Sequence, residues 1–181
     1  DYDSLSHNPN NWGTAVTPDR ATPGKINSIS PKDFDLALSD ISITPSPPIE
    51  GITLTAQVKV NNLGNNAANT YSISLYNDLN FDAIPQPGEL INTVNLSNLA
   101  SGDSIIQNFN LGAFSQGDLQ LIGVVNFGLD EDESNNELIK EFEILPPPPP
   151  FNAVIINEIM YAPSTGEPEW VEIYNNSDQT Y

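Results

Sequence analysis

The sequence predicts an all-β protein whose centre is an antiparallel β-sandwich. Segments of seven to ten residues alternate apolar and polar side chains, which is the period of half-buried strands. Clusters rich in Gly, Asn, Ser and Asp separate these segments and are typical of turns. No segment carries the apolar stripe of an amphipathic helix. Many short strands joined by tight turns therefore form the expected architecture.

The segment at 52–60, ITLTAQVKV, follows a first strand-like segment at 34–43 and shows the clearest alternation. Its apolar face holds Ile52, Leu54, Ala56, Val58 and Val60. The later segments lie at 71–77, 89–96, 103–111, 119–127 and 137–145. Seven such strands in roughly 115 residues is the strand count of an immunoglobulin-like sandwich, so we predict that fold.

The charge of the chain is strongly negative. Its 181 residues include 5 Lys and Arg against 24 Asp and Glu, a formal net charge of −19. Such a surface repels phosphate backbones and anionic lipids, so nucleic-acid binding is not expected. Because the sequence has no apolar run long enough to span a bilayer, we expect no direct membrane insertion. Cations are the natural counterparts of this surface.

The residues on which most catalytic sites depend are scarce. Cysteine is absent, which excludes disulfides, zinc–thiolate sites and thiol catalysis. His7 is the single histidine and falls in a turn-rich segment, so a Ser-His-Asp triad has little to build on. No Gly-rich phosphate loop is present. We therefore predict that the chain is not an enzyme.

Composition divides the chain into four parts. Residues 1–32 are rich in Asn, Pro, Ser and Thr, 33–145 carry the strands, and 151–181 begin a new strand-like pattern. Between them, 146–150 is an unbroken proline run, which favours polyproline II and forms a spacer of roughly 15 Å. Because the chain starts at Asp1 with neither a Met nor a leader, we expect a processed or excised piece of a longer protein.

Parts of the chain resemble two protein families. The stretches LALSDISITPSP and VVNFGLDEDESNNELIKEFEI resemble the CARDB family, the bacterial cell-adhesion-related domains with an immunoglobulin-like sandwich, over about 33–145. VIINEIMYAPSTGEPEWVEIYNNSDQTY is similar to the opening of bacterial lamin-tail-like domains, and NPNNWGTAVTPDRATPGKIN resembles their closing segment. The resemblance implies a complete CARDB module between two partial lamin-tail modules. Both families occur in multidomain secreted bacterial proteins, so the resemblance implies a context and not an activity.

The loop DLNFDAIPQPGE at 78–89 is the best candidate site. Its oxygen-bearing residues fall at positions 1, 3, 5, 7, 9 and 12, the spacing of an EF-hand calcium loop. The predicted metal ligands are Asp78, Asn80, Asp82, the carbonyl oxygen of Ile84 and Glu89, with Gln86 acting through a water. Calcium is therefore the expected cofactor.

The same loop departs from the EF-hand pattern in three respects. Position 6 is Ala83 where Gly is expected, Pro85 and Pro87 lie inside the loop, and predicted strands flank it in place of helices. Water screens charge repulsion at a surface, so a solvated acidic loop without a metal stays open as the alternative.

Other acidic positions offer less. Asp130, Asp132 and Glu133 could hold a second cation, although a solvated charge run before a turn is the simpler interpretation. Glu158, Glu169 and Glu172 lie on strand-like segments and could face one another. Paired carboxylates also serve glycoside hydrolysis, but no aromatic cleft accompanies these three. Trp12 and Trp170 are expected to pack in sandwich cores.

These observations lead to one expected function and two alternatives. We expect a non-catalytic, extracellular structural or adhesion module of a multidomain bacterial surface or secreted protein, stabilised by calcium. One alternative is a self-assembling filament or surface-layer subunit, joined by strand complementation between the partial end modules. The other is an accessory module of a secreted hydrolase or nuclease. Expected partners are neighbouring modules and further copies of the chain, and a carbohydrate or protein ligand stays open.

Overall fold

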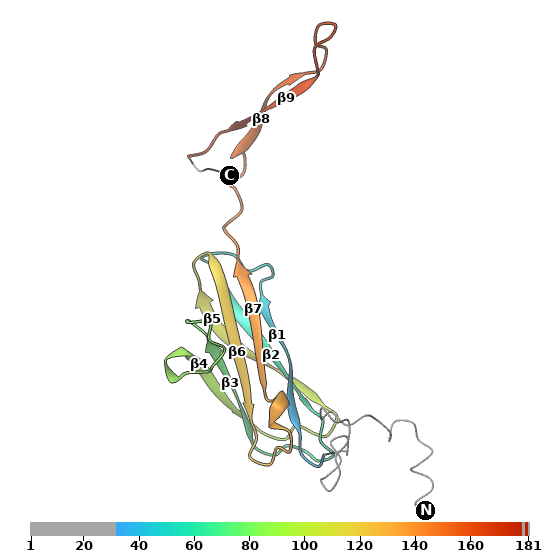
Figure 1. Cartoon of the computed structure of the whole chain (residues 1–181), viewed down its shortest axis with the longest axis vertical. Helices are drawn as coiled ribbons and strands as arrows, with labels where there is room; N and C mark the ends of the chain where they lie inside the picture. Colours follow the sequence, from blue (N-terminus) through green and yellow to red (C-terminus); the bar gives the residue numbers. More distant parts are fainter. Residues whose placement is uncertain (1–31, 179, 181) are drawn as a thin grey trace, which may run out of the picture. The chain divides into compact units, whose positions relative to one another are not determined.

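The computed structural model describes residues 32–178 and 180, and in this part of the chain it is all-β. The strands up to Ile144 form two antiparallel sheets packed face to face (Figure 1). The three-stranded sheet has the order β1-β2-β5 and contains β1 (Leu36–Thr44), β2 (Thr53–Asn62) and β5 (Ser104–Ala113). The four-stranded sheet has the order β4-β3-β6-β7 and contains β4 (Leu90–Leu96), β3 (Tyr71–Asn77), β6 (Gly117–Asn126) and β7 (Glu137–Ile144).

The predicted immunoglobulin-like sandwich is therefore confirmed. Each of the seven predicted segments corresponds to one observed strand, with ends that differ by at most two residues. Two short 3-10 helices, η2 (Pro87–Glu89) and η3 (Glu133–Asn135), interrupt the loops before β4 and β7. The predicted lamin-tail-like flank at 1–32, with His7 and Trp12, lies outside the described residues except for Lys32.

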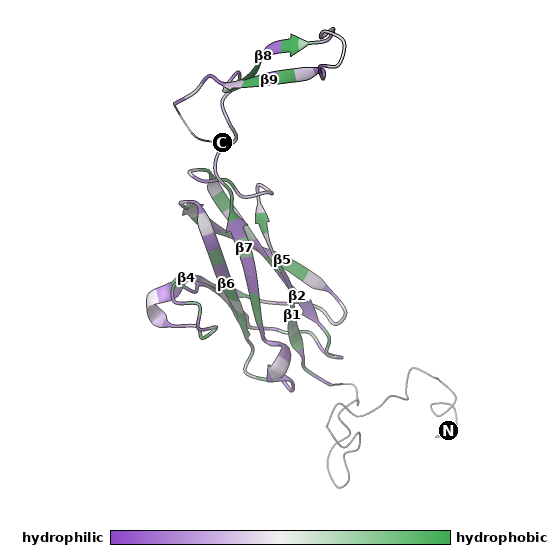
Figure 2. Ribbon diagram, turned by 45° about the horizontal axis from the view of Figure 1, so that its top comes forward, coloured by the Kyte–Doolittle hydropathy of each residue, from purple (hydrophilic) through white to green (hydrophobic). Residues whose placement is uncertain are grey.

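The core lies between the two sheets and follows the alternation of each strand, visible as green and purple bands in Figure 2. In β2, the side chains of Leu54, Ala56, Val58 and Val60 are fully buried. Full burial of each large aliphatic side chain contributes about 2 kcal/mol. The prediction was wrong for Ile52, which is 47% exposed because it precedes the first paired residue of β2.

Strand β6 is buried on both faces along much of its length. Leu119 and Leu121 point into the core, while Gln120 and Ile122 lie on the opposite face of the sheet and are also buried. Because β6 is flanked by β3 and β7, only a covering segment or neighbouring side chains can shield that outer face. The burial of a polar Gln120 there is the feature that leads to the candidate site.

The chain divides into two compact units after Ile144. The second unit contains an antiparallel hairpin of β8 (Val154–Met160) and β9 (Trp170–Asn175). Within that unit Trp170 is 39% exposed, so the prediction that it packs in a sandwich core was wrong. A two-stranded hairpin has no second layer to bury its apolar side chains against.

Within residues 32–178 and 180, no helix is long and apolar enough to cross a membrane.

Candidate functional site

The acidic loop joins β3 to β4, the two strands at one edge of the four-stranded sheet. It begins directly at the sheet, because the Asp78 amide donates a hydrogen bond to the Gln120 carbonyl oxygen at 2.9 Å. It ends in η2, where the Glu89 amide donates to the Gln86 carbonyl oxygen. The first residue of the loop is therefore bound to β6, and its last residue is bound to the loop itself.

Asp78 and Glu89, at the two ends of the loop, are both buried. Asp78 is 1% exposed, and its carboxylate accepts a hydrogen bond from the Ala83 amide at 2.8 Å through Oδ2. Glu89 is 8% exposed, and its carboxylate accepts a hydrogen bond from the Leu79 amide at 3.1 Å through Oε1. Because both acceptors bind amides of the loop, both carboxylates are turned into it.

Each of these carboxylates keeps one buried oxygen without a hydrogen bond in the described chain, Asp78 Oδ1 and Glu89 Oε2. A third oxygen in the same situation within residues 32–178 and 180 is Oε1 of Gln120. We call these three atoms the orphan acceptors. A fourth buried atom without a partner there, the Tyr71 hydroxyl, lies at the far end of β3, and desolvation by burial raises the pKa of that tyrosine. A buried carboxylate oxygen without a donor is costly, so the three orphan acceptors call for a partner.

Asn80 and Asp82 lie at the exposed tip of the loop and bind each other. The Asn80 side-chain amide donates to Asp82 Oδ2 at 2.9 Å, and the Asp82 backbone amide donates back to Asn80 Oδ1 at 3.2 Å. Asp82 also accepts from the Ile84 amide and from Gln86 Nε2, each at 2.9 Å. These contacts form a compact turn that uses both oxygens of Asp82.

The loop adopts the backbone conformation that an EF-hand assigns to Gly, although its residue there is Ala83. The φ angle of Ala83 is 61°, and that of Phe81 is 57°. Left-handed φ values strain residues with a Cβ, so this turn costs conformational free energy at both residues. The absence of Gly at position 6 therefore does not prevent the sharp turn.

The structure thus separates the five predicted ligands into two sets. Asp78 and Glu89 lie together in the buried part of the loop, whereas Asn80 and Asp82 lie together at its tip, beside Ile84, whose side chain is 58% exposed. Among residues 32–178 and 180, no group of three or more His, Cys, Asp or Glu side chains converges as a metal site. The calcium site stays a prediction. Asp78 and Glu89 are buried and turned into the loop, whereas Asn80 and Asp82 are exposed and bind each other.

Sequence reasoning missed Gln120 and Glu141. Gln120 lies on β6 across from Asp78, and its Nε2 donates to Glu141 Oε1 on β7 at 2.9 Å. Glu89, Asp78, Gln120 and Glu141 therefore follow one another across the strand order β4-β3-β6-β7. A polar residue between Leu119 and Leu121 in a strand that is otherwise apolar was the available signal.

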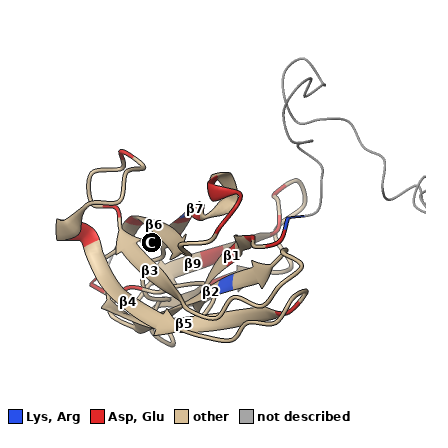
Figure 3. Ribbon diagram, turned by 90° about the horizontal axis from the view of Figure 1, so that it is seen from below, with Lys and Arg blue, Asp and Glu red and all other residues tan. Residues whose placement is uncertain are grey.

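A cavity of about 300 Å³ opens where the loop meets the outer face of the same sheet. Phe81 of the loop and Phe142 line it, together with the carboxylates of Asp118, Glu141 and Glu143. In Figure 3, acidic segments are spread over the loops and strand ends, whereas basic segments are few. The surroundings of the loop therefore favour cations over anions.

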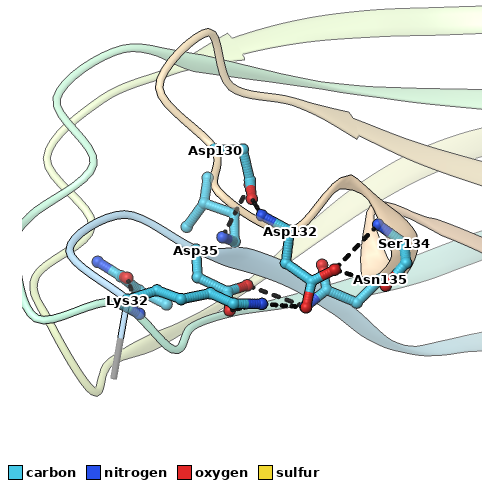
Figure 4. Close-up of polar contacts among 9 residues, drawn as sticks. Lys32, Asp35, Asp130, Asp132, Ser134 and Asn135 are labelled. Carbon is cyan, nitrogen blue, oxygen red and sulfur yellow. Dashed lines mark hydrogen bonds and ion pairs between the residues drawn. The ribbon is translucent and has the colours of Figure 1, made fainter. Parts of the chain in front are cut away.

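The second acidic run, at 129–136, is occupied by hydrogen bonds of its own. Asp130 accepts from the Leu36 amide at 3.0 Å and from the Asp132 amide at 2.8 Å. Asp132 caps η3 by accepting from Ser134 and also binds the Lys32 ammonium (Figure 4). The Lys32 Nζ lies 3.4 Å from Asp35 Oδ2, so one lysine lies between two carboxylates. The Lys32 ammonium is therefore a cation that Asp132 and Asp35 bind, and a second metal at Asp130, Asp132 and Glu133 stays a prediction.

The ion pair shifts the pKa values of both of its partners. Burial lowers the pKa of Lys32, but the hydrogen bond to Asp132 and the charges of Asp35 and Asp132 outweigh burial and leave that pKa above its ordinary value. The hydrogen bond from Lys32, followed by that from Ser134, lowers the pKa of Asp132. Both groups are therefore charged at neutral pH, and the cluster joins the start of β1 to the loop before β7.

In the second unit, Glu158 and Glu172 are direct neighbours across β8 and β9. The Asn157 side-chain amide donates to Glu172 Oε1. Like charges directly opposite each other destabilise a strand pair, and the amide reduces this cost. Glu169 precedes β9 and is not part of that cross-strand pair.

Fold and site together define a class: an immunoglobulin-like β-sandwich module with an acidic inter-strand loop. The CARDB family model matches residues 33–140. The chain therefore belongs to the CARDB family, a family of non-catalytic modules. The lamin-tail-like flanks stay a prediction.

Comparison with solved structures finds similar structures at low sequence identity. The CARDB domain of a Pyrococcus furiosus protein, in complex with di-metal ions, has a TM-score of 0.52 and 17% identity, covering 64% of this chain and 97% of that one. A domain of a Methanosarcina acetivorans protein, described as a cell-surface protein, has a TM-score of 0.48 and 22% identity, covering 61% and 93%. A β-glucosidase from Erythrobacter marinus has a TM-score of 0.44 and 15% identity, covering 74% and 19%. No curated protein matches the chain.

Proposed function

We propose that the chain is a calcium-stabilised, non-catalytic structural module of an extracellular bacterial protein. The observation that carries this proposal is the pair of buried carboxylates at the two ends of one loop, Asp78 and Glu89, each with an orphan acceptor. Two negative charges held out of water need a compensating charge. A cation bound in the loop would supply it and would connect β3 to β4.

Ligand chemistry favours calcium among the common cations. The loop offers carboxylate, amide and backbone oxygens, and the chain has no cysteine to attract zinc. Calcium accepts six to eight oxygens in flexible geometry, whereas magnesium requires a near-ideal octahedron. In the proposed site Asp78 and Glu89 are the carboxylate ligands. Asn80, Asp82 and the carbonyl oxygen of Ile84 would join them if the tip of the loop turned inward.

The proposed location agrees with this chemistry. Extracellular modules bind calcium with dissociation constants of about 0.1 to 1 mM, so a site with few protein ligands is sufficient outside the cell. The family resemblance to cell-adhesion-related domains supports the same location. The Pyrococcus domain, which shares the fold, is in complex with di-metal ions, so the fold is compatible with metal binding. The proposed partners are neighbouring modules of the same protein.

Calcium titration of the full chain tests the proposal. Calorimetry should show heat of binding, and thermal unfolding should occur at a higher Tm in calcium than in EDTA. At a calcium concentration 100 times Kd, the expected stabilisation is about 2.7 kcal/mol. Absence of both heat and a Tm shift would contradict the proposed site.

Asp78→Asn provides the matched variant. We expect it to lose the calcium response while being no less stable than the wild type in EDTA, because it removes one of two buried charges. Asp103→Asn, at an exposed turn, is the control and should retain the full response. A calcium response in Asp78→Asn equal to that of the wild type would place the cation elsewhere.

Self-association through the second unit is a second candidate function, and the exposed hairpin favours it. In β8 and β9, Ile156 is 63% exposed, Val171 is 54% and Ile173 is 68%. Apolar strands with open edges are templates for further strands, so a second copy could complete this unit. Light scattering over a range of concentrations distinguishes the cases, since a monomer at every concentration contradicts self-association.

A further inference from the structure

We infer that Gln120 supplies a protein oxygen to the proposed loop cation, so that the ion joins the loop to the β6 strand. The inference rests on the cation site proposed above and adds a ligand that no EF-hand spacing contains. It changes the role of the ion: instead of ordering one loop, the cation would connect three adjacent strands, β4, β3 and β6.

The strand register places Gln120 beside Asp78. Asn77 and Leu121 are the last registered pair between β3 and β6, and the Asp78 amide continues the ladder by binding the Gln120 carbonyl oxygen at 2.9 Å. Residues opposite each other in an antiparallel pair project from the same face, with Cβ atoms about 5 Å apart. The side chains of Asp78 and Gln120 are therefore neighbours on the face turned away from the core.

Glu89 reaches the same place from the end of η2, directly before β4. Its Oε1 accepts from the Leu79 amide at 3.1 Å, and Leu79 directly follows Asp78. The three side chains are all at least nine-tenths buried, with Asp78 at 1%, Gln120 at 6% and Glu89 at 8% exposure. Each carries one of the orphan acceptors.

The chemistry of these three atoms points to a cation. All three are acceptors, and two belong to carboxylates, so a neutral donor such as water would leave the charge uncompensated. One divalent ion can bind three oxygens and offset both charges. Only two carboxylates take part, which agrees with the absence of a three-acid cluster among the described residues.

Glu141 sets the orientation of the Gln120 amide. The Nε2 of Gln120 donates to Glu141 Oε1 at 2.9 Å on β7, which flanks β6 on the side opposite β3. With the nitrogen held on the β7 side, the Oε1 is left for the β3 side. Glu141 is therefore a positioning residue for the proposed ligand.

Calcium titration of Gln120→Met in the full chain tests the inference. Methionine keeps the approximate volume of glutamine and removes the oxygen. Loss of outer partners of metal sites typically costs 10- to 100-fold in affinity, so we expect loss of this ligand to weaken binding by at least about tenfold. Gln120→Glu should retain binding, because it restores an oxygen and adds a charge. Gln107→Met, on β5 of the other sheet, is the matched control.

The outcomes separate this inference from the proposal on which it rests. If the wild type binds no calcium, the loop site itself fails. If the wild type binds and Gln120→Met binds equally well, the loop site stands and the role of Gln120 is overturned.

A second measurement needs no substitution and covers the case in which Gln120→Met does not fold. In NMR titration of the wild type with calcium, the side-chain amide resonances of Gln120 should shift together with the backbone amide of Ala83, which binds the Asp78 carboxylate. Shifts at Ala83 without any shift at the Gln120 side chain would overturn the inference.

Discussion

Gly64 is the residue at which the fold leaves least room. A Cβ added to it would lie 2.7 Å from the Asp35 amide nitrogen and 2.8 Å from the Asp33 carbonyl oxygen. Both are backbone atoms, and the Gly64 amide itself binds the Asp35 carbonyl oxygen and the Asn62 side chain. The turn after β2 therefore packs directly on the backbone at the start of β1.

We predict that Gly64→Ala lowers the free energy of unfolding by about 3 kcal/mol, because backbone must move to admit the methyl group. Urea unfolding monitored by circular dichroism measures the loss. Gly128→Ala is the control, since a Cβ there meets nothing within 4 Å, and it should change stability by less than about 0.5 kcal/mol. Equal effects of the two substitutions would contradict the close approach at Gly64.

Lys32 makes a pH-dependent contribution to stability. The lowered pKa of Asp132 means that the pair contributes above the unfolded pKa of about 3.9 and is lost as pH falls through the folded value. The raised pKa of Lys32 means that the contribution is present below about 10.4 and is lost as pH rises through the folded value. The stabilising window therefore spans neutral pH.

We predict that Lys32→Met destabilises the chain by about 1 kcal/mol at pH 7, since the pair is partly exposed. The difference from the wild type should vanish when pH falls below the folded pKa of Asp132. Unfolding measured at a series of pH values from 7 downward gives the comparison, and the difference should shrink as the pH falls. A difference that is independent of pH would show that Lys32 acts through packing and not through charge.

At the scale of elements, the β3–β4 loop accepts local strain to make its turn. Ala83 occupies a left-handed conformation that costs a residue with a Cβ about 1 kcal/mol. We predict that Ala83→Gly raises the free energy of unfolding by about 0.5 kcal/mol, after subtracting the greater flexibility of Gly in the unfolded chain. Ala113→Gly at the end of β5 is the control and should be destabilising. Thermal unfolding of the two variants should show opposite signs.

The strands themselves could be predicted from the sequence because their alternation is local. In β2 the period of two identifies the buried residues almost one by one. The exception is Ile52, which precedes the strand and is exposed. The double burial of β6 could not be predicted, because it depends on which segment lies over the outer face. An alternating pattern specifies one buried face and is silent about the other.

The candidate site was only partly visible in the sequence for a related reason. Asp78 and Glu89 share a loop, so their spacing could be compared with a known ligand pattern. Gln120 and Lys32 act on partners distant in sequence, Lys32 on an aspartate 100 residues away. Such partners are set by strand register and sheet order, and local spacing carries neither.

At the scale of the whole molecule, the division after Ile144 has a thermodynamic consequence. The first unit has a core shared by two sheets, whereas the second presents a two-stranded hairpin with exposed Ile156 and Ile173. We predict that residues 1–145 unfold cooperatively with the Tm of the full chain, and that 145–181 alone shows no cooperative transition. Calorimetry of the two fragments tests this. A fall in the Tm of 1–145 would contradict the independence of the first unit.

The contacts around Lys32 join the start of β1 to the segment that precedes β7. Asp130 and Asn135, which precede β7, bind the Leu36 amide and Asp35 at the beginning of β1. β1 and β7 therefore start at the same end of the sandwich. The chain enters the sandwich at that end, beside Lys32, and leaves it at the opposite end, after Ile144. Tension between these two points would run along the strands, perpendicular to the rungs of the β1–β2 and β6–β7 ladders. The hydrogen bonds of these ladders would then be sheared together and not broken one after another.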